Sequence, residues 1–215
     1  MEQNRREEPQ NIFRKGLRYL GTFLGVGGFC FCLTCFYMAM RGVMDLGGFV
    51  ASGGPYEIAH PAPGWIWVFF AAVFAGLFFL LVNHLNARKV GGLNLLVLAW
   101  PALFLSLGEN FLEYSFTFPG SEPGIVWGWF ICGAVFILMG GLPLIFIVAN
   151  FIKVLKRKAD PLYTGFLPWK MKISPPGLQK EDRKLHIPFI LLILNLAFVG
   201  FGIYGGVIFF EFIAK

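Results

Sequence analysis

Charge is scarce in this sequence: 14% of its 215 residues are Asp, Glu, Lys or Arg, whereas 57% are hydrophobic and the mean hydropathy is +0.68. A soluble domain of this length needs more charge to keep its surface hydrated. The few charges also fall into short blocks between long apolar runs. We therefore interpret the net charge of +6 as a topology signal rather than a nucleic-acid-binding surface. No nucleic-acid partner is expected.

Enzyme motifs are missing as well. The chain has no Gly-x-Ser-x-Gly, no phosphate-binding loop and no His-Glu-x-x-His. Histidine is rare, and His84 and His186 fall at the ends of apolar runs, whereas a bis-histidine haem needs deeper imidazoles. The sequence therefore predicts no cofactor, no metal ion and no catalytic residue, and it favours a protein that is not an enzyme.

Cysteine is limited to four residues, all within apolar runs, which argues against a disulfide framework. Cys30, Cys32 and Cys35 have a spacing that could hold a metal or a cluster, but no histidine or acid adjoins them. We interpret them, and Cys132, as small packing residues of membrane helices. The first apolar run, of about 21 residues, is too long for the core of a signal peptide, so it is expected to be a retained helix.

Five apolar runs are long enough to cross a bilayer, which takes about 20 helical residues for a hydrocarbon core of about 30 Å. A spanning segment must satisfy its own backbone, so each run is predicted to be a helix. The sequence thus predicts an all-α, polytopic membrane helix bundle with five transmembrane helices. They form a single membrane domain over residues 19–212, with helices at about 19–40, 64–83, 92–112, 125–152 and 187–210.

The third and fourth runs carry irregular features. Pro101 lies in the middle of the third, and its far end holds acidic residues, so it is the weakest of the five. The fourth contains Gly140, Gly141 and Pro143, which mark a place for a kink. Asn94 and Asn195 are polar residues within predicted helices, and they are expected to form hydrogen bonds between helices.

Lys and Arg indicate the orientation of the helices. With the N-terminus inside, the cytoplasmic side holds a basic tail (1–18), a turn with Arg88 and Lys89, and a basic loop (153–186). Of the 18 Lys and Arg residues, only Arg41 and Lys215 then lie outside, whereas the 12 acidic residues divide evenly. We therefore predict a cytoplasmic N-terminus and an outer C-terminus. Four tryptophans fall where an outer aromatic belt belongs: Trp65, Trp67, Trp127 and Trp129.

The basic loop 153–186 also contains aromatic and apolar residues among its lysines, including Tyr163, Phe166, Leu167 and Trp169. One interpretation is that the loop lies on the anionic headgroups of the cytoplasmic face of the lipid bilayer. The other is a solvated connector.

The predicted outer loop, residues 41–63, is rich in glycine and proline, and two titratable groups, Glu57 and His60, stand three residues apart in it. This loop is either a cap that binds an ion, a headgroup or a partner, or a rigid turn over the helix ends. Its GGFVASGGPYEIAHPAPGW run, with LFLSLGENFLEY and WFICGAVFILMGGLPL, resembles a family of small multi-pass bacterial membrane proteins that are uncharacterised. The resemblance covers residues 41–150 and implies a bacterial inner membrane, but no activity and no functional residue.

A second candidate site lies in residues 108–114. Glu109 and Glu113 are four residues apart and Asn110 lies between them, so the three occupy adjoining parts of one helix surface. Arg41 and Asp45 are expected at the same outer level on the first helix. Either Asp45, Glu109 and Glu113 form an entry site for a cation or a proton, or Arg41 neutralises a carboxylate in a structural ion pair.

Three functions stay open. The favoured one is a non-enzymatic subunit, scaffold or assembly partner, which binds another membrane protein or forms a homo-oligomer. The second is a small channel or transporter for an ion or solute, suggested by the acidic residues and by a weak internal repeat, in which Pro63-Gly64-Trp65 corresponds to Pro123-Gly124-Ile125. The third is an enzyme acting on lipid headgroups through Glu57 and His60.

Overall fold

The structure is a computed structural model, and it describes residues 9–46, 63–117, 124–155, 167–170 and 189–215. These residues form five helices and one pair of two-residue strands. In chain order the elements are α1 (Pro9–Asp45), α2 (Trp67–Val90), β1 (Gly92–Leu93), α3 (Leu95–Thr117), α4 (Trp127–Leu155), β2 (Trp169–Lys170) and α5 (Phe189–Ile213). All five helices are long and apolar enough to cross a membrane. The predicted five-helix, multi-pass membrane architecture is confirmed.

The helices are longer than the predicted spans, because hydropathy marks the part suited to lipid rather than the ends of the helix. α1 has 37 residues and begins at Pro9, well inside the segment predicted as a tail. Its first turns contain Arg, Lys and Leu, which are good helix formers whether they are polar or apolar. The weakest predicted span is a complete helix of 23 residues with Pro101 inside it. α4 continues through Pro143 without a break in its helical assignment.

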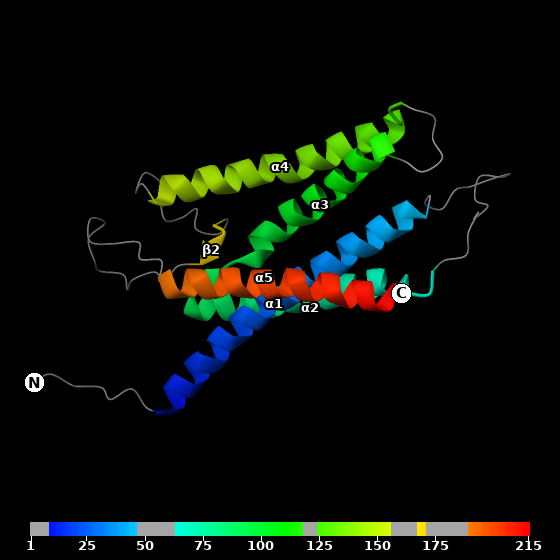
Figure 1. The fold of residues 1–215 in the computed structure, drawn as a ribbon. Coiled ribbons are helices and arrows are strands. Elements are labelled where there is room, and N and C mark those ends of the chain that lie inside the picture. Colours follow the sequence, from blue (N-terminus) through cyan, green and yellow to red (C-terminus); the bar gives the residue numbers. More distant parts are fainter. Residues whose placement is uncertain (1–8, 47–62, 118–123, 156–166, 171–188) are drawn as a thin grey trace, which may run out of the picture.

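The helices form two groups that lie side by side (Figure 1). In the first group, α1 is central and packs against both α2 and α5. In the second, α3 and α4 form a hairpin, and α3 makes lighter contacts with α1 and α2. Within the described residues, α4 and α5 each pack closely against one helix only.

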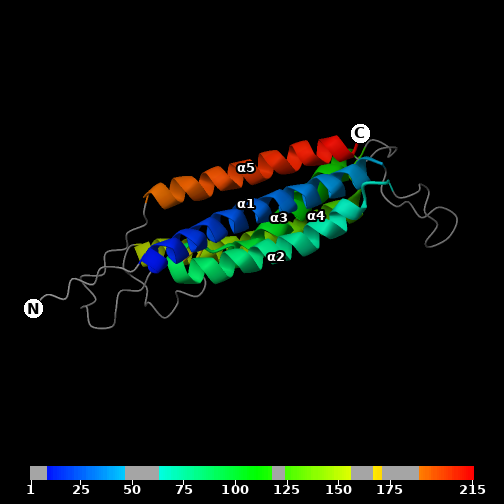
Figure 2. The same cartoon turned by 90° about the horizontal axis from the view of Figure 1, so that it is seen from below.

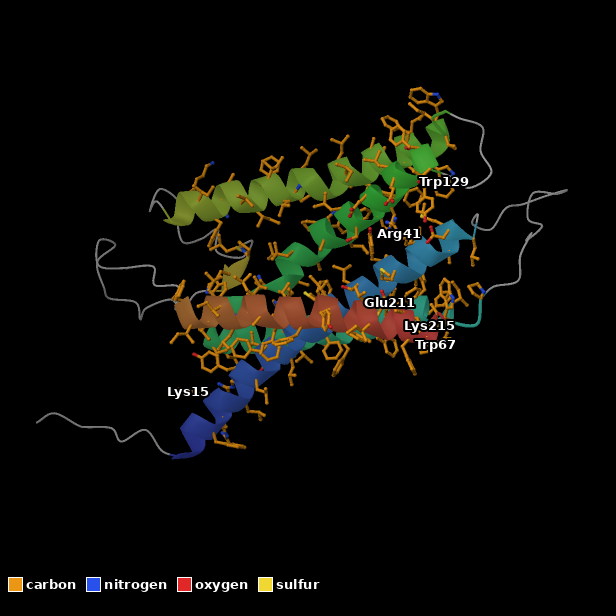
Figure 3. All side chains as sticks on the ribbon, viewed as in Figure 1. Lys15, Arg41, Trp67, Trp129, Glu211 and Lys215 are labelled. Atoms are coloured by element: carbon orange, nitrogen blue, oxygen red, sulfur yellow. The ribbon has the colours of Figure 1, made fainter. Side chains whose placement is uncertain are left out.

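Figure 2 shows the helices running in a common direction, with the start of α1 and the end of α5 at opposite ends of the bundle. We name the end that holds the C-terminus the outer end and the opposite end the inner end, following the predicted orientation. Figure 3 shows the label of Lys15 at the inner end and, toward the outer end, those of Arg41, Trp67, Trp129, Glu211 and Lys215. Which end faces the cytoplasm stays a prediction.

Glycines allow the helices of each group to approach closely. A Cβ added to Gly25 of α1 would lie 2.7 Å from the Cβ of Asn83 on α2, and one added to Gly133 of α4 would lie 2.8 Å from the backbone nitrogen of Leu112 on α3. Gly206 of α5 meets Thr34 of α1 in the same way, at 2.8 Å from its Cβ. Gly21–Gly25 and Gly202–Gly206 have the four-residue spacing typical of tightly packed membrane helices.

The apolar core lies between α1, α2 and α5. It consists of Cys32, Cys35, Phe36, Ala39, Val68, Ala72 and Phe210. Cys32 and Cys35 are buried in it and all four cysteines are free, which agrees with a packing role for these two residues.

The inner end is organised around a short turn between α2 and α3. Gly91 and Gly92 have φ angles of 82° and 121°, which favour glycine. β1 then pairs antiparallel with β2, with Gly92 opposite Lys170 and Leu93 opposite Trp169. Leu167 and Trp169 are buried against the protein. The bundle itself therefore covers the apolar surfaces of these two side chains, and headgroup contact of the basic loop 153–186 stays a prediction.

Asparagines provide the polar contacts of the inner end. Asn83, which is fully buried, donates to the carbonyl oxygen of Thr22 on α1 and accepts the backbone N–H of Leu95 on α3. Asn94 precedes α3 and donates to the carbonyl oxygen of Leu167, 3.3 Å away. Asn195 donates to Leu191 of its own helix. The expected interhelical bonds of Asn94 and Asn195 are thus corrected: Asn94 binds the returning loop, and Asn195 binds within α5.

Candidate polar site at the outer end

An ion pair joins the two helix groups at the outer end. Arg41 of α1 donates through Nη1 to Oε2 of Glu113 on α3 at 2.6 Å, and through Nη2 to Oε1 at 2.5 Å. Nη1 also lies 3.4 Å from the hydroxyl oxygen of Tyr37, one helical turn earlier. A planar guanidinium fits a carboxylate with two parallel hydrogen bonds in this way. The ion pair predicted as one of two alternatives for Arg41 is therefore present.

A second contact lies beside the ion pair. The hydroxyl of Tyr114, on a side chain that is almost fully buried, donates to Oδ1 of Asp45, and it lies 3.3 Å from the carbonyl oxygen of Arg41. Arg41 and Asp45 are one turn apart on α1, while Glu113 and Tyr114 are neighbours on α3. We name these four residues the outer clasp, because together they fasten α3 to successive turns of α1.

Glu109 does not join the outer clasp. It is exposed, because it points away from the helix face that carries Tyr114. That face is marked by Leu103 and Leu107, which pack against the core of the other group. The predicted cation or proton site of Asp45, Glu109 and Glu113 is therefore not assembled: two of its carboxylates are held in the clasp, and the third lies apart.

Asn110 lies one turn further from the outer end than Tyr114, on the same face of α3. Its side chain is buried, and its Nδ2 donates to the carbonyl oxygen of Ser106 at 3.3 Å. Its Oδ1 has no hydrogen-bond partner within the described part of the chain. Asn110 thus lies one helical turn from the outer clasp, and its Oδ1 is an acceptor without a partner among the described residues.

Two predicted site residues, Glu57 and His60, lie outside the described residues. Tyr37 was not predicted, and Tyr114 ends the candidate segment 108–114 but was given no role there. Tyr114 directly follows Glu113 near a helix end, and a tyrosine in that position has a hydroxyl that needs a partner when the ring is buried. That signal could have identified it from the sequence.

The described residues contain no group of three His, Cys, Asp or Glu side chains that could hold a metal ion. In the outer clasp, the guanidinium and both carboxylates have partners within the protein. The contacts of the outer clasp therefore account directly for one role, which is to hold α1 and α3 together.

Fold and site together define the class: a five-helix, multi-pass membrane protein whose two helix groups are joined by polar contacts at both ends. No protein-family model matches the chain, and no curated protein or solved structure shows significant similarity to it. The resemblance of residues 41–150 to bacterial membrane proteins therefore stays a prediction.

Replacement of Arg41 by Gln should weaken the contact between α1 and α3. Both charged side chains are about one third exposed (34% and 38%), so we expect the free energy of unfolding to fall by only about 1–2 kcal/mol. Thermal unfolding of the detergent-purified protein measures this loss. Glu113→Gln should have a similar effect and Glu109→Gln should have none. Equal destabilisation by the two glutamate variants would contradict the assignment of Glu113 to the clasp.

Proposed function

We propose that this protein is a non-enzymatic subunit or assembly partner within a membrane-protein complex of a bacterial inner membrane, with its N-terminus in the cytoplasm. The proposal is supported first by the positions of α4 and α5. Among the described residues each packs closely against one helix only, so most of its surface faces away from the other described helices. Large apolar side chains cover these surfaces, among them Ile145, Phe146, Phe201 and Tyr204.

Lipid alone could cover such surfaces, so the main support comes from two glycines. Gly141 of α4 and Gly200 of α5 lie near the middle of their helices, and no described atom beyond the neighbouring residues and nearby backbone of the same helix lies within 4 Å of a Cβ added to either. An unpacked glycine destabilises a helix by about 1 kcal/mol relative to alanine. In membrane helices that loss is offset where the glycine allows another helix to approach. Gly141 and Gly200 therefore fit contacts with helices from outside the chain.

The polar residues lend less support to the other two functions. A channel or transporter was suggested by the acidic residues, but Asp45 and Glu113 are engaged in the outer clasp and Glu109 lies apart from them. An enzyme acting on lipid headgroups depends on Glu57 and His60, which lie outside the described residues. A role in assembly needs none of these groups to be available.

Gly141→Leu tests the proposal, because the new side chain enters open space in the isolated protein. We expect its melting temperature not to fall, because leucine favours a helix more than glycine does. The amount of co-purifying partner should fall about tenfold, as expected for about 1.4 kcal/mol of overpacking at an interface. The measurement is native mass spectrometry after extraction in mild detergent. The mass of the complex shows whether the partner is another membrane protein or a second copy of this chain.

Gly140→Leu is the matched comparison, since a Cβ there would lie 2.9 Å from the backbone nitrogen of Leu105. This variant should lose stability, because the hairpin of α3 and α4 cannot close around the added side chain. A wild-type protein that is extracted as a monomer without any partner would refute the proposal. So would full retention of the complex when both Gly141→Leu and Gly200→Leu are introduced.

A further inference from the structure

The start of α1 extends beyond the end of α2. Asn83 and Asn86 of α2 lie opposite Gly25 and Gly21 of α1, with an added Cβ at Gly21 only 2.7 Å from Nδ2 of Asn86. Because the two helices are antiparallel, the end of α2 at Val90 lies level with about residue 17 of α1. Residues 9–17 therefore continue past the end of α2, and Figure 1 shows the first turns of α1 standing clear of the other helices.

An apolar stripe follows one face of this extension into the bundle. Phe13, Leu17, Leu20 and Leu24 are 74%, 59%, 48% and 50% exposed. Their spacing of four, three and four residues puts them on the same side of the helix. The stripe therefore runs without interruption from the projecting turns to the part of α1 that packs against α2.

Basic residues accompany the stripe. Arg14 is exposed and Arg18 is partly exposed, one turn apart, and Lys89 is exposed at the end of α2. Acidic residues of the described chain all belong to the outer half of the bundle: Asp45, Glu109, Glu113 and Glu211. The inner end of α1 thus offers positive charge next to apolar surface, with no described carboxylate to neutralise it.

We propose that this surface, formed by Phe13, Arg14, Leu17 and Arg18, binds the headgroups of anionic phospholipids. A helix of 37 residues is about 55 Å long at 1.5 Å per residue, whereas the hydrocarbon core is about 30 Å thick. Even when α1 is tilted, its first turns reach the headgroup layer. There the guanidinium groups contact lipid phosphate, and the apolar face lies against the upper acyl chains.

The order of groups along α1 favours a lipid over an acidic protein segment. Arg14 and Arg18 lie beside the first part of the stripe only, and the apolar stripe alone continues to Leu20 and Leu24, toward the middle of the membrane. A phospholipid carries its phosphate and its acyl chains in that same order. This surface is separate from Gly141 and Gly200, so the inference does not depend on the proposed role in assembly.

The test uses the full-length protein in mild detergent, titrated with phosphatidylglycerol or phosphatidylcholine, with bound lipids counted by native mass spectrometry. The wild type should bind phosphatidylglycerol more tightly. The double variant Arg14→Gln/Arg18→Gln should lose about 25-fold in affinity for that lipid, at about fivefold per arginine, and its affinity for phosphatidylcholine should not change.

Lys215→Gln, at the outer end, makes the same change in net charge as Arg14→Gln alone; it should leave lipid binding unchanged, whereas Arg14→Gln should lose about fivefold in affinity. Leu17→Gln keeps both arginines but interrupts the apolar stripe, so it should weaken phosphatidylglycerol binding severalfold. This variant tests the inference even if the arginine variant does not fold. Equal binding of the two lipids by the wild type would overturn the proposal. Unchanged affinity of the arginine variant for phosphatidylglycerol would overturn it too. So would an equal loss in the lysine variant, because the effect would then depend on net charge alone.

Discussion

Gly25→Leu is expected to prevent α1 and α2 from packing and to leave little folded protein. A Cβ at this position would lie 2.7 Å from Cβ, 2.8 Å from the backbone nitrogen and 2.9 Å from Cα of Asn83. Two of these three atoms belong to the backbone of α2, so a change of rotamer cannot relieve the overlap. We expect a loss of about 3 kcal/mol or more in the free energy of unfolding.

The measurement is the yield of monodisperse protein after extraction, together with its melting temperature. Gly16→Leu provides the control, because no described atom lies within 4 Å of an added Cβ at that position of the same helix. Its yield and melting temperature should be no lower than those of the wild type. If Gly25→Leu behaved like Gly16→Leu, the close approach of α1 to α2 in this structure would be wrong.

The contrast between these two glycines also marks a limit of the sequence. Abundant glycine predicts close helix contacts, but it does not say which glycine meets which helix. Gly25 faces α2, whereas Gly27, two residues later, faces α5. A Cβ added to Gly27 would lie 3.3 Å from the backbone oxygen of Phe198. The neighbour of each glycine is set by how α1 is rotated within the bundle, and a single apolar sequence carries little information on that rotation.

The five spans and the placement of charge were predictable, because membrane insertion depends on hydropathy and on Lys and Arg, which are local properties of the sequence. The ion pair of Arg41 was predictable for a related reason: a guanidinium and carboxylates were expected at the same depth, where an unpaired charge is costly. Choosing Glu113 over Glu109 required the packing face of α3, which is fixed only when Leu103 and Leu107 meet the core.

The inner end was the part least accessible to sequence reasoning. Asn83 is the last residue of the second predicted span (64–83), where a side chain in the headgroup region is expected, yet it is fully buried. Its hydrogen-bond partners come from α1 and α3, and the nearby Asn94 binds a loop segment far along the chain. Such contacts depend on the short turn at Gly91 and Gly92, which folds α3 back against the end of α2.

Asn83→Leu should therefore destabilise the inner end strongly even though leucine is similar in size and suits a membrane helix. Oδ1 of Asn83 accepts the backbone N–H of Leu95 at 3.1 Å, and Leu95 is buried. The first N–H groups of a helix have no partner within it, so Asn83 serves α3 as a cap supplied from α2. Without it, a buried donor has no acceptor, at an expected loss of about 2–3 kcal/mol.

Hydrogen exchange in detergent should locate the effect of Asn83→Leu. Protection should fall for residues 92–95 and 167–170, which the turn and the β1–β2 pair hold together, and it should persist around Tyr114 in the outer clasp. Asn195→Leu is the matched control, because Asn195 is equally buried but bonds only within α5, and its Oδ1 has no partner among the described residues. Replacing such a group by an apolar one is neutral or stabilising. Equal destabilisation by both variants would show that burial of an asparagine, rather than the cap on α3, determines the loss.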